Sequence, residues 1–452
     1  MFLNKRALLL LMIVALASSF NACDSSSSSS GEIPMAYADL PGTLISENTT
    51  WSGTKTIVGA VYVLPGVTLT ITAGSTIKFV FHDNNPDSVG AIITLRGDAT
   101  SFSDGARPSG RLVAVGTATN PIVFTSAKAT PAAGDWGGII LIGEATNNVV
   151  GGEGDVEGLA TEIKYGGTKD TDDSGVLQYV RIEYCGFGIA TDSEINGLSL
   201  YSVGSGTTID HVQVYKCTDD GYEWFGGTVN SKYLISSFND DDSFDFDQGF
   251  RGKNQFWLAV QAPGADNGFE NDGRATIGSG TETNPTIYNV TVVGFGGPKD
   301  ASDANAGLRL REDLKGTYRN FVIANFDGAA FRLDSSVAND ATRGNYRSGT
   351  LSVKNVVLYN NNIAGNNANG GFGSATDSTV YGAAANSVTF GNPNFSNAGQ
   401  NDYRLMAGSP ALSNGATPPS DGFFDVNATY RGAFNSSTNW ATGAWVRWTD
   451  GI

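Results

Sequence analysis

A five-residue phrase recurs along the middle of this chain at nearly constant spacing. Each copy centres on an apolar anchor that follows Gly, Ser or Ala, and successive anchors are 24, 22, 25, 39 and 23 residues apart. The anchors are Leu198, Tyr222, Phe244, Phe269, Leu308 and Phe331. A period in the low twenties, with one short alternating strand per copy, is typical of a solenoid. The repeat therefore predicts an all-β fold, a single right-handed parallel β-helix.

Side chains alternate between the two faces of a strand. The anchor and the residue two positions later are expected to point inward, where Tyr222, Trp224, Phe244 and Phe246 would form a stacked core. The residues between and after them would point outward and follow one another from coil to coil. These outward residues are Glu223 and Phe225, Asp245 and Asp247, Glu270 and Asp272, Arg309 and Arg311, Arg332 and Asp334. We name this set the outward ladder; it is acidic for three coils and then carries arginine.

The first 22 residues have the pattern of an export signal. Lys5 and Arg6 precede an apolar run that is too short to span a bilayer, and small residues lead to Cys23. Cys23 is the expected lipidation site, followed by a serine-rich tether over residues 23–40; the alternative is a plain secretory signal with an incidental cysteine. The segment predicts a cell-envelope protein, periplasmic or surface-exposed, attached to a membrane through lipid.

Two further cysteines lie at equivalent positions of two predicted coils. Cys185 ends the strand-like run from Val180, and Cys217 ends the similar run from Val212. Neighbouring strands lie about 4.8 Å apart, so a disulfide between the two cysteines is plausible in an exported protein. A stacked pair of free buried thiols is the alternative, because a bridge also needs suitable Cβ vectors.

The net charge of the chain limits the classes of partner that it can bind. The net charge is −17, and removal of the signal takes away two basic residues and no acid. Such an acidic chain would be repelled by nucleic acid and by anionic lipid, so we expect no nucleic-acid partner. The same acidity is compatible with binding of a divalent cation, with Ca²⁺ as the possible cofactor.

The remaining chain divides into a long solenoid and a tail. Residues 41–393 are predicted to form the β-helix, with loops near 83–90, 147–173 and 361–378, and no amphipathic helix of useful length is visible. Residues 394–452 are expected to cap the last coil, with aromatic side chains that include Phe423, Phe424, Trp440, Trp445 and Trp448.

Several motifs resemble those of pectin-lyase-like β-helix lipoproteins of Gram-negative bacterial envelopes. They are Gly59–Gly66 with Leu69–Ile71, Gly116–Ser126, Gly134–Gly138, Asp219–Gly227, and Asp402–Leu405 with Ser409–Ala411. The resemblance covers nearly all of the chain after the signal and implies the fold. It implies little about activity, because one β-helix scaffold carries lyases, hydrolases, adhesins and inert spacers.

The outward ladder and the acidic residues just before its strands hold the candidate site. The acids of this site are Asp219, Asp220, Glu223, Asp240, Asp241, Asp242, Asp245, Asp247, Glu270 and Asp272. Outward residues on one strand are roughly 6.6 Å apart and those on neighbouring coils roughly 4.8 Å apart, spacings that suit carboxylate pairs of glycosidases or a Ca²⁺ site. The candidate metal ligands are Asp241, Asp242, Asp245 and Asp247, and the candidate binding residues are Glu223, Glu270 and Asp272.

Two catalytic versions use the same ladder. A hydrolase would use Asp245 or Asp247 as acid, with Glu223, Asp241 or Asp242 as base; the Gly-His-Gly segment of polygalacturonases that share this fold does not occur here. A lyase would use Ca²⁺ to neutralise a uronate and a basic residue to remove the adjacent proton. The basic candidates are Arg309, Arg311, Lys315 and Arg332.

Outward charge on a solenoid is also the ordinary state of a solvated face. The sequence therefore favours a noncatalytic surface protein that binds glycan or a divalent cation. A polysaccharide lyase or glycoside hydrolase acting on an acidic polysaccharide is the main alternative, and a structural adhesin or spacer is the third.

Overall fold

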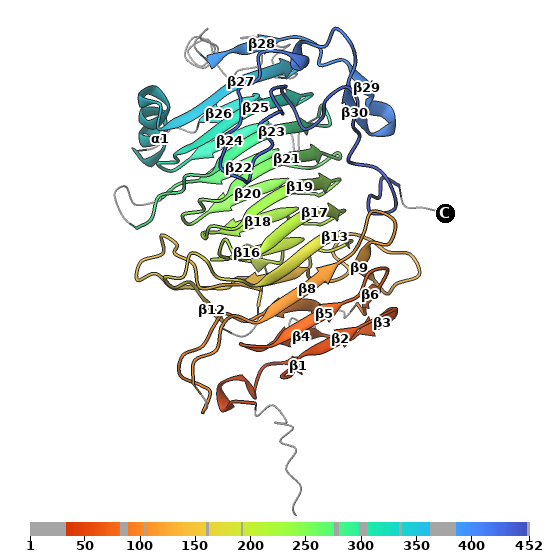
Figure 1. The fold of residues 1–452 in the computed structure, drawn as a ribbon, viewed down its shortest axis with the longest axis vertical. Helices are drawn as coiled ribbons and strands as arrows, with labels where there is room; N and C mark the ends of the chain where they lie inside the picture. The colour runs from red at the N-terminus through yellow and green to blue at the C-terminus, as the bar shows by residue number, and fades with distance from the viewer. Residues whose placement is uncertain are drawn as a thin grey trace, which may run out of the picture. The chain divides into compact units, whose positions relative to one another are not determined.

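Strands of successive coils stack in parallel and in register in the computed structural model (Figure 1). The structure describes residues 33–81, 89–103, 105–159, 162–190, 193–274, 280–297, 305–333, 337–361 and 386–449. Residues 33–452 form one compact unit. The predicted signal segment, Cys23 and Asp334 lie outside the described residues. Within the described part, no helix has the length and apolar character needed to cross a membrane.

One face of every coil contributes a short strand to a 10-stranded parallel sheet, which we call sheet A. Its strands, in spatial order, are β1 (Gly42–Ile45), β4 (Ala60–Val63), β7 (Ala91–Thr94), β10 (Ile139–Ile142), β16 (Leu198–Tyr201), β18 (Tyr222–Phe225), β20 (Phe244–Asp247), β22 (Phe269–Asp272), β24 (Leu308–Arg311) and β26 (Phe331–Leu333). Every repeated anchor opens one of these strands. The right-handed parallel β-helix predicted from the repeat is confirmed.

The opposite side of the coils forms a 14-stranded sheet, sheet B. Its long path consists of β2 (Thr49–Trp51), β5 (Thr68–Ile71), β8 (Arg111–Val115), β13 (Gly175–Glu183), β17 (Thr208–Tyr215), β19 (Asn230–Ser237), β21 (Lys253–Val260), β23 (Thr286–Val293), β25 (Gly316–Ala324), β27 (Leu351–Tyr359) and β28 (Val388–Phe390). Three further strands, β3 (Thr54–Ile57), β6 (Thr76–Phe79) and β9 (Ile122–Ser126), stack beside it.

In the early coils, sheet B receives two separate strands from each coil. From β13 onward, these two strands are continuous and form one longer strand that bends at a single residue, the corner residue. The first half of β13 pairs with β8 and the second half with β9. The corner residue has a left-handed backbone in every coil: Tyr179, His211, Tyr233, Phe256, Asn289, Asn320 and Asn355 all have φ between 51° and 63°. Such a backbone is unfavourable for aromatic residues, and ring stacking offsets part of its cost. His211 lies between Tyr179 and Tyr233, with ring centroids 4.4 and 4.3 Å apart.

The core consists of the inward residues of both sheets. Tyr222, Trp224, Phe244 and Phe246 have no exposed surface, as the alternation of the repeat predicts. Tyr222 stacks on Phe244 of the next coil, with ring centroids 5.4 Å apart. The inward aromatic residues are therefore core rather than a surface for sugar stacking.

The C-terminal tail returns along the outside of sheet B (Figure 1). Amide side chains of the coils bind the main chain of single tail residues through paired hydrogen bonds. Gln213 binds Arg447 with two contacts of 2.7 Å, and Asn320 binds Ala416 at 2.7 and 2.8 Å. The segment carries the hairpin β29 (Phe395–Asn397) and β30 (Asp402–Leu405), with short 3₁₀ turns at Ala398–Gln400 and Pro410–Leu412.

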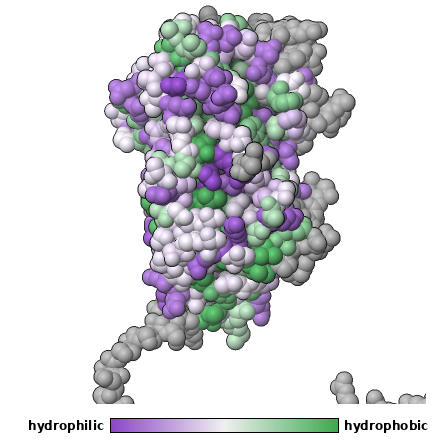
Figure 2. Space-filling model, turned by 90° about the vertical axis from the view of Figure 1, so that its right-hand side faces the viewer, coloured by the Kyte–Doolittle hydropathy of each residue, from purple (hydrophilic) through white to green (hydrophobic). Residues whose placement is uncertain are grey.

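The aromatic residues of this tail pack on coils in the middle of the β-helix. Trp445 packs edge-on against His211 with ring centroids 5.2 Å apart, and Trp440 packs against Tyr233 at 5.3 Å. Figure 2 shows that hydrophilic and apolar residues are interspersed over the face that it presents. The tail therefore covers a flank of earlier coils, whereas β28 is the last strand added to sheet B.

Besides the tail hairpin and the 3₁₀ turns, the described residues form one helix and two further hairpins outside the two sheets. The helix α1 (Val337–Ser348) contacts β24, β26 and β27, so the expectation of no useful helix was wrong. Its sequence is rich in polar residues and lacks an apolar stripe, and contacts to the coils hold it: Asn345 donates to the Asp313 carboxylate at 2.9 Å. Two small hairpins, β11 (Gly154–Asp155) with β12 (Lys164–Tyr165) and β14 (Gly188–Ala190) with β15 (Ser193–Glu194), arise from insertions.

Candidate functional site

The outward ladder is assembled as the repeat predicts. One row runs through Glu223, Asp245, Glu270, Arg309 and Arg332, each paired in register with the next. In a second row, Phe225 pairs with Asp247 and Asp272 pairs with Arg311. Residues separated by 22 to 39 positions in the sequence therefore become neighbours on one face of sheet A.

A cavity of about 290 Å³ opens over the acidic part of this ladder. We call it the acidic groove, and its lining is Glu157, Glu194, Asn196, Asp219, Asp220, Glu223, Asp241, Asp242, Asp245, Asp266, Glu270 and Arg309. The groove unites Glu223, Asp241, Asp242, Asp245 and Glu270 of the predicted site. Asp247 and Asp272 are on the second row and do not line it.

Three groove acids were not among the predicted residues. Glu157 and Glu194 come from insertions before and within the coils, and Asp266 comes from the turn before β22. The positions of these acids depend on segments of irregular length. The repeat does not predict which residues of such segments lie beside the ladder. Only their acidic character is visible in the sequence.

The Asn or Asp that begins each of the first four phrases can accept a hydrogen bond from the turn of the next coil. The Asn196 side chain accepts from the Asp220 amide at 3.2 Å, Asp220 accepts from the Asp242 amide at 2.9 Å, and Asp242 accepts from the Asn267 amide. Side chains thus bind the turn of the next coil, as capping residues do. Asp220 and Asp242 each use one carboxylate oxygen, Oδ1, in this way.

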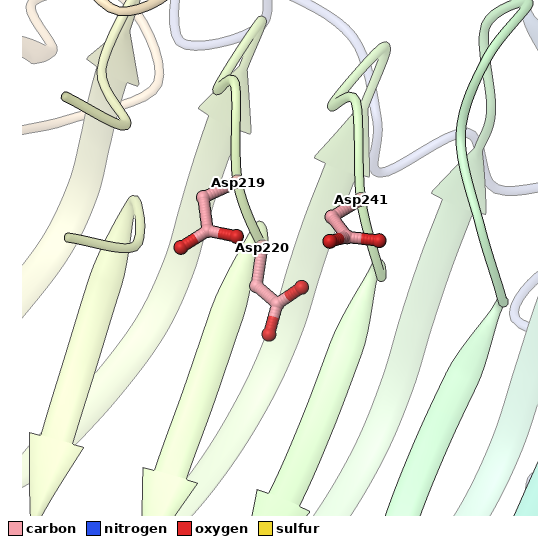
Figure 3. A group of neighbouring side chains, drawn as sticks. All are labelled: Asp219, Asp220 and Asp241. Atoms are coloured by element: carbon pink, nitrogen blue, oxygen red, sulfur yellow. The ribbon is translucent and has the colours of Figure 1, made fainter. Parts of the chain in front are cut away.

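Carboxylates of neighbouring coils converge in three groups. Figure 3 shows Asp219 and Asp220 on one turn and Asp241 on the turn of the next coil. One ligand atom from each of these three residues lies within 4.8 Å of the others. The same holds for Asp220, Glu223 and Asp245, and for Asp241, Asp242 and Asp266. Oxygen atoms at these separations suit a hard divalent cation.

Burial makes these acids unfavourable as a group of anions. The carboxyls whose pKa is raised well above its usual value are Asp220, Glu223, Asp242 and Asp245. Desolvation is the largest cause for each, and neighbouring carboxylates add to it. Asp247 follows the same pattern, and its pKa is raised to about 6. The Oδ1 atom of Asp245 is buried and accepts no hydrogen bond from any residue that the structure describes.

The arginine end of the ladder is electrostatically different. Arg309 donates to Glu270 at 2.6 Å, and Arg311 binds both oxygens of Asp272 at 2.6 and 2.8 Å. Arg311 also pairs with Glu270, and Lys315 pairs with Glu282. Burial lowers the pKa of the Arg311 guanidinium, but Asp272 and Glu270 outweigh it and raise that pKa above its usual value, which opposes use of Arg311 as a base. Arg332 lies next to Arg309 in register and does not line the groove.

The two cysteines are neighbours in the interior of adjacent coils. Cys185 and Cys217 are fully buried, and both are free thiols in this structure. Burial, followed by contact with Cys185, raises the pKa of the Cys217 thiol. The disulfide alternative is therefore not formed here, and the structure corresponds to the stacked-thiol alternative.

Comparison with known proteins identifies the family. The model of the pectate-lyase-like β-helix domain matches residues 42–401, which is most of the chain. The chain belongs to this family. No curated protein and no solved structure matches it. Membership in the pectate-lyase-like β-helix family agrees with the stacked sheets, and the site must be interpreted from its own residues.

Proposed function

We propose that this pectate-lyase-like β-helix protein is a noncatalytic, exported surface protein that binds a divalent cation, with Ca²⁺ as the leading candidate, in the acidic groove. The buried, unpartnered Oδ1 of Asp245 is the observation that carries this proposal. It lies between Glu223 and Glu270 of the adjoining coils, and the nearby Arg309 and Arg311 are engaged by Glu270 and Asp272.

A cation would resolve the repulsion among these carboxylates. Buried like charges must either take up protons or recruit an opposite charge. The groove contains several carboxylate oxygens at irregular distances from one another. Ca²⁺ accepts six to eight oxygen ligands and does not require octahedral geometry. Mg²⁺ needs closer, near-ideal octahedral geometry and is therefore the weaker candidate.

Calorimetric titration of the chelator-treated protein with CaCl₂ tests the proposal directly. Saturable binding is expected for the wild type, and Asp220→Asn with Asp245→Asn should remove it. Glu47→Gln, an exposed carboxylate outside the groove, is the matched control and should bind as the wild type does. Absence of wild-type binding, or unchanged binding in the double variant, would refute it.

Export and lipid attachment are part of the same proposal and rest on residues 1–23. A Cys23→Ser precursor should be released from the membrane fraction while its groove still binds Ca²⁺. Continued membrane association of this variant would overturn the lipid anchor. The two readouts separate the anchor from the groove.

A glycoside hydrolase is the second candidate, favoured by the Glu223–Asp245 pair. These acids are neighbours on adjacent coils, and burial raises the pKa of both carboxyls, so one could stay protonated as the acid. Hydrolysis also requires the other carboxyl to be ionised as base or nucleophile. A panel of acidic polysaccharides should then yield reducing ends that disappear in Asp245→Asn. If no product forms with or without Ca²⁺, the enzyme candidate fails and the binding proposal stands.

A further inference from the structure

A second cavity lies against the N-terminal coils and shares no lining residue with the acidic groove. Its volume is about 540 Å³, within the range of roughly 300–1,000 Å³ that small-molecule sites occupy. Four parts of the chain enclose it: the 3₁₀ turn Met35–Tyr37 with Leu40, the segment after β7, Glu144 after β10, and the β11–β12 insertion with the residues that flank it. We call it the N-terminal cavity.

One wall of this cavity is apolar. Tyr37, Leu40 and Ile163 are partly buried and pack against the main core, and Leu95 is almost fully buried. The Tyr37 hydroxyl is held by the Asp98 carboxylate, so its ring is fixed in the wall. This wall presents a rigid nonpolar surface beside the polar groups.

The polar lining is fixed by internal pairs. Arg96 donates to the Gly166 carbonyl at 2.8 Å and pairs with Glu153. Lys169 binds both oxygens of Glu144 at 2.8 and 2.9 Å, and the Glu144 side chain is only 17% exposed. Lys164 pairs with Glu162 at 2.8 Å. The three basic groups of the lining thus each have an acidic partner in it, and four acids in total leave little net charge.

We propose that the N-terminal cavity binds a neutral carbohydrate of one or two sugar units. A strongly charged ligand would have to break one of these pairs, whereas a sugar hydroxyl both donates and accepts. Neighbouring hydroxyls therefore bind Arg96, Lys169 and Glu144 without displacing their partners. The C–H face of a sugar ring packs on the wall formed by Tyr37 and Ile163. This site is independent of cation binding in the groove.

Ligand-detected saturation-transfer NMR and calorimetry on the purified protein test this assignment. The probes are maltose, cellobiose and lactose, with galacturonic acid and glucosamine as charged comparators. At least one neutral disaccharide should bind with a dissociation constant in the millimolar range or tighter, with or without chelator. The charged sugars should not compete with it.

Filling the cavity locates the binding. Ile163→Trp should weaken disaccharide binding at least tenfold, and Leu40→Trp, from another part of the lining, should do the same if the first variant does not fold. Val58→Trp, at an exposed position that does not line the cavity, should leave affinity unchanged. No saturation by any neutral probe, equal binding of a charged sugar, or full affinity in a folded cavity-filling variant would overturn the proposal.

Discussion

The two ends of one ladder on sheet A solve the same electrostatic problem differently. At the upper end, Glu270 and Asp272 lie in register with Arg309 and Arg311, which neutralise them within the protein. At the lower end, Glu223 and Asp245 are in register with each other, and among the described residues neither forms a direct ion pair with a basic side chain. The acids of the upper end are neutralised by arginine side chains, whereas the lower end has an excess of negative charge.

The difference teaches which part of the ladder is available for binding. A paired carboxylate gains from its partner what it loses in solvation, whereas an unpaired buried carboxylate raises the free energy of the folded state until a proton or cation arrives. Perturbations of the two ends should therefore have opposite signs. That contrast can be tested without knowing the physiological ligand.

Removing Arg311 should give the largest effect. Arg311→Ala leaves Asp272 and Glu270 without their partner in a largely buried setting, and we expect the free energy of unfolding to fall by about 2–4 kcal/mol. Chemical and thermal denaturation measure this change. Arg404→Ala, which breaks an exposed Arg–Asp pair outside the ladder, should have little effect. Equal stability of Arg311→Ala and wild type would show that the upper pairs do not stabilise the fold.

The pH dependence of stability should report the lower end. The pKa of Asp247 is raised from 3.8 to about 6, and those of Asp220, Glu223 and Asp245 are raised by the same causes. A raised pKa contributes stability below the unfolded-state value, and this contribution is lost as pH rises through the folded-state value. In chelator, stability should therefore fall from about pH 4 to pH 6 and above, by about 1.4 kcal/mol per pH unit for each proton released.

Saturating Ca²⁺ supplies the control for this experiment. Because the cation binds the ionised carboxylates, it should flatten the decline between pH 5 and 7. Melting curves across this range, with chelator and with CaCl₂, measure both slopes. Identical slopes would mean that the groove acids titrate without contact with the cation, which counts against the proposed site.

The repeat predicted the ladder and its order because both follow from two simple periods. Alternation along a strand places Tyr222 inside and Glu223 outside, and the coil period places Glu223 beside Asp245. Neither period predicts the rotamer of a side chain or the partner that it contacts. The ion pair of Arg309 with Glu270 depends on side-chain rotamers and on the conformation of the long coil between them, which separates the two residues by 39 positions.

Contacts between segments that are distant in the sequence could also not be predicted from the repeat. Glu157 and Glu194 reach the groove from insertions, and Trp445 reaches His211 through a tail that returns over earlier coils. The Asn and Asp residues that open the first four phrases could be recognised as turn residues. Their bonds to the next coil, such as Asp220 to the Asp242 amide, became evident only from the stacked turns.

Neutralising one lower-end acid should stabilise the cation-free protein, in contrast to loss of Arg311. Asp245→Asn removes a buried charge between Glu223 and Glu270, so we expect a gain of about 1 kcal/mol in chelator. The same change should abolish the stabilisation that CaCl₂ gives the wild type. Thermal melts of Glu47→Gln serve as the control. A loss of stability in chelator would place Asp245 among residues already balanced by the fold.

Added salt should have the smallest effect on the free energy of unfolding, and this effect should differ in sign between the two ends of the ladder. Raising NaCl to about 1 M shortens the screening length to roughly 3 Å, which weakens repulsion among groove acids as well as attraction in the arginine pairs. Because the groove is open to solvent and the pairs are in direct contact, we expect the relief of repulsion to prevail in the cation-free wild type, with a gain of a few tenths of a kcal/mol. Asp220→Asn with Asp245→Asn should convert this gain to no change or a small loss, because only the arginine pairs then respond. A salt-induced gain of equal size in the double variant would trace the effect to charges outside the groove.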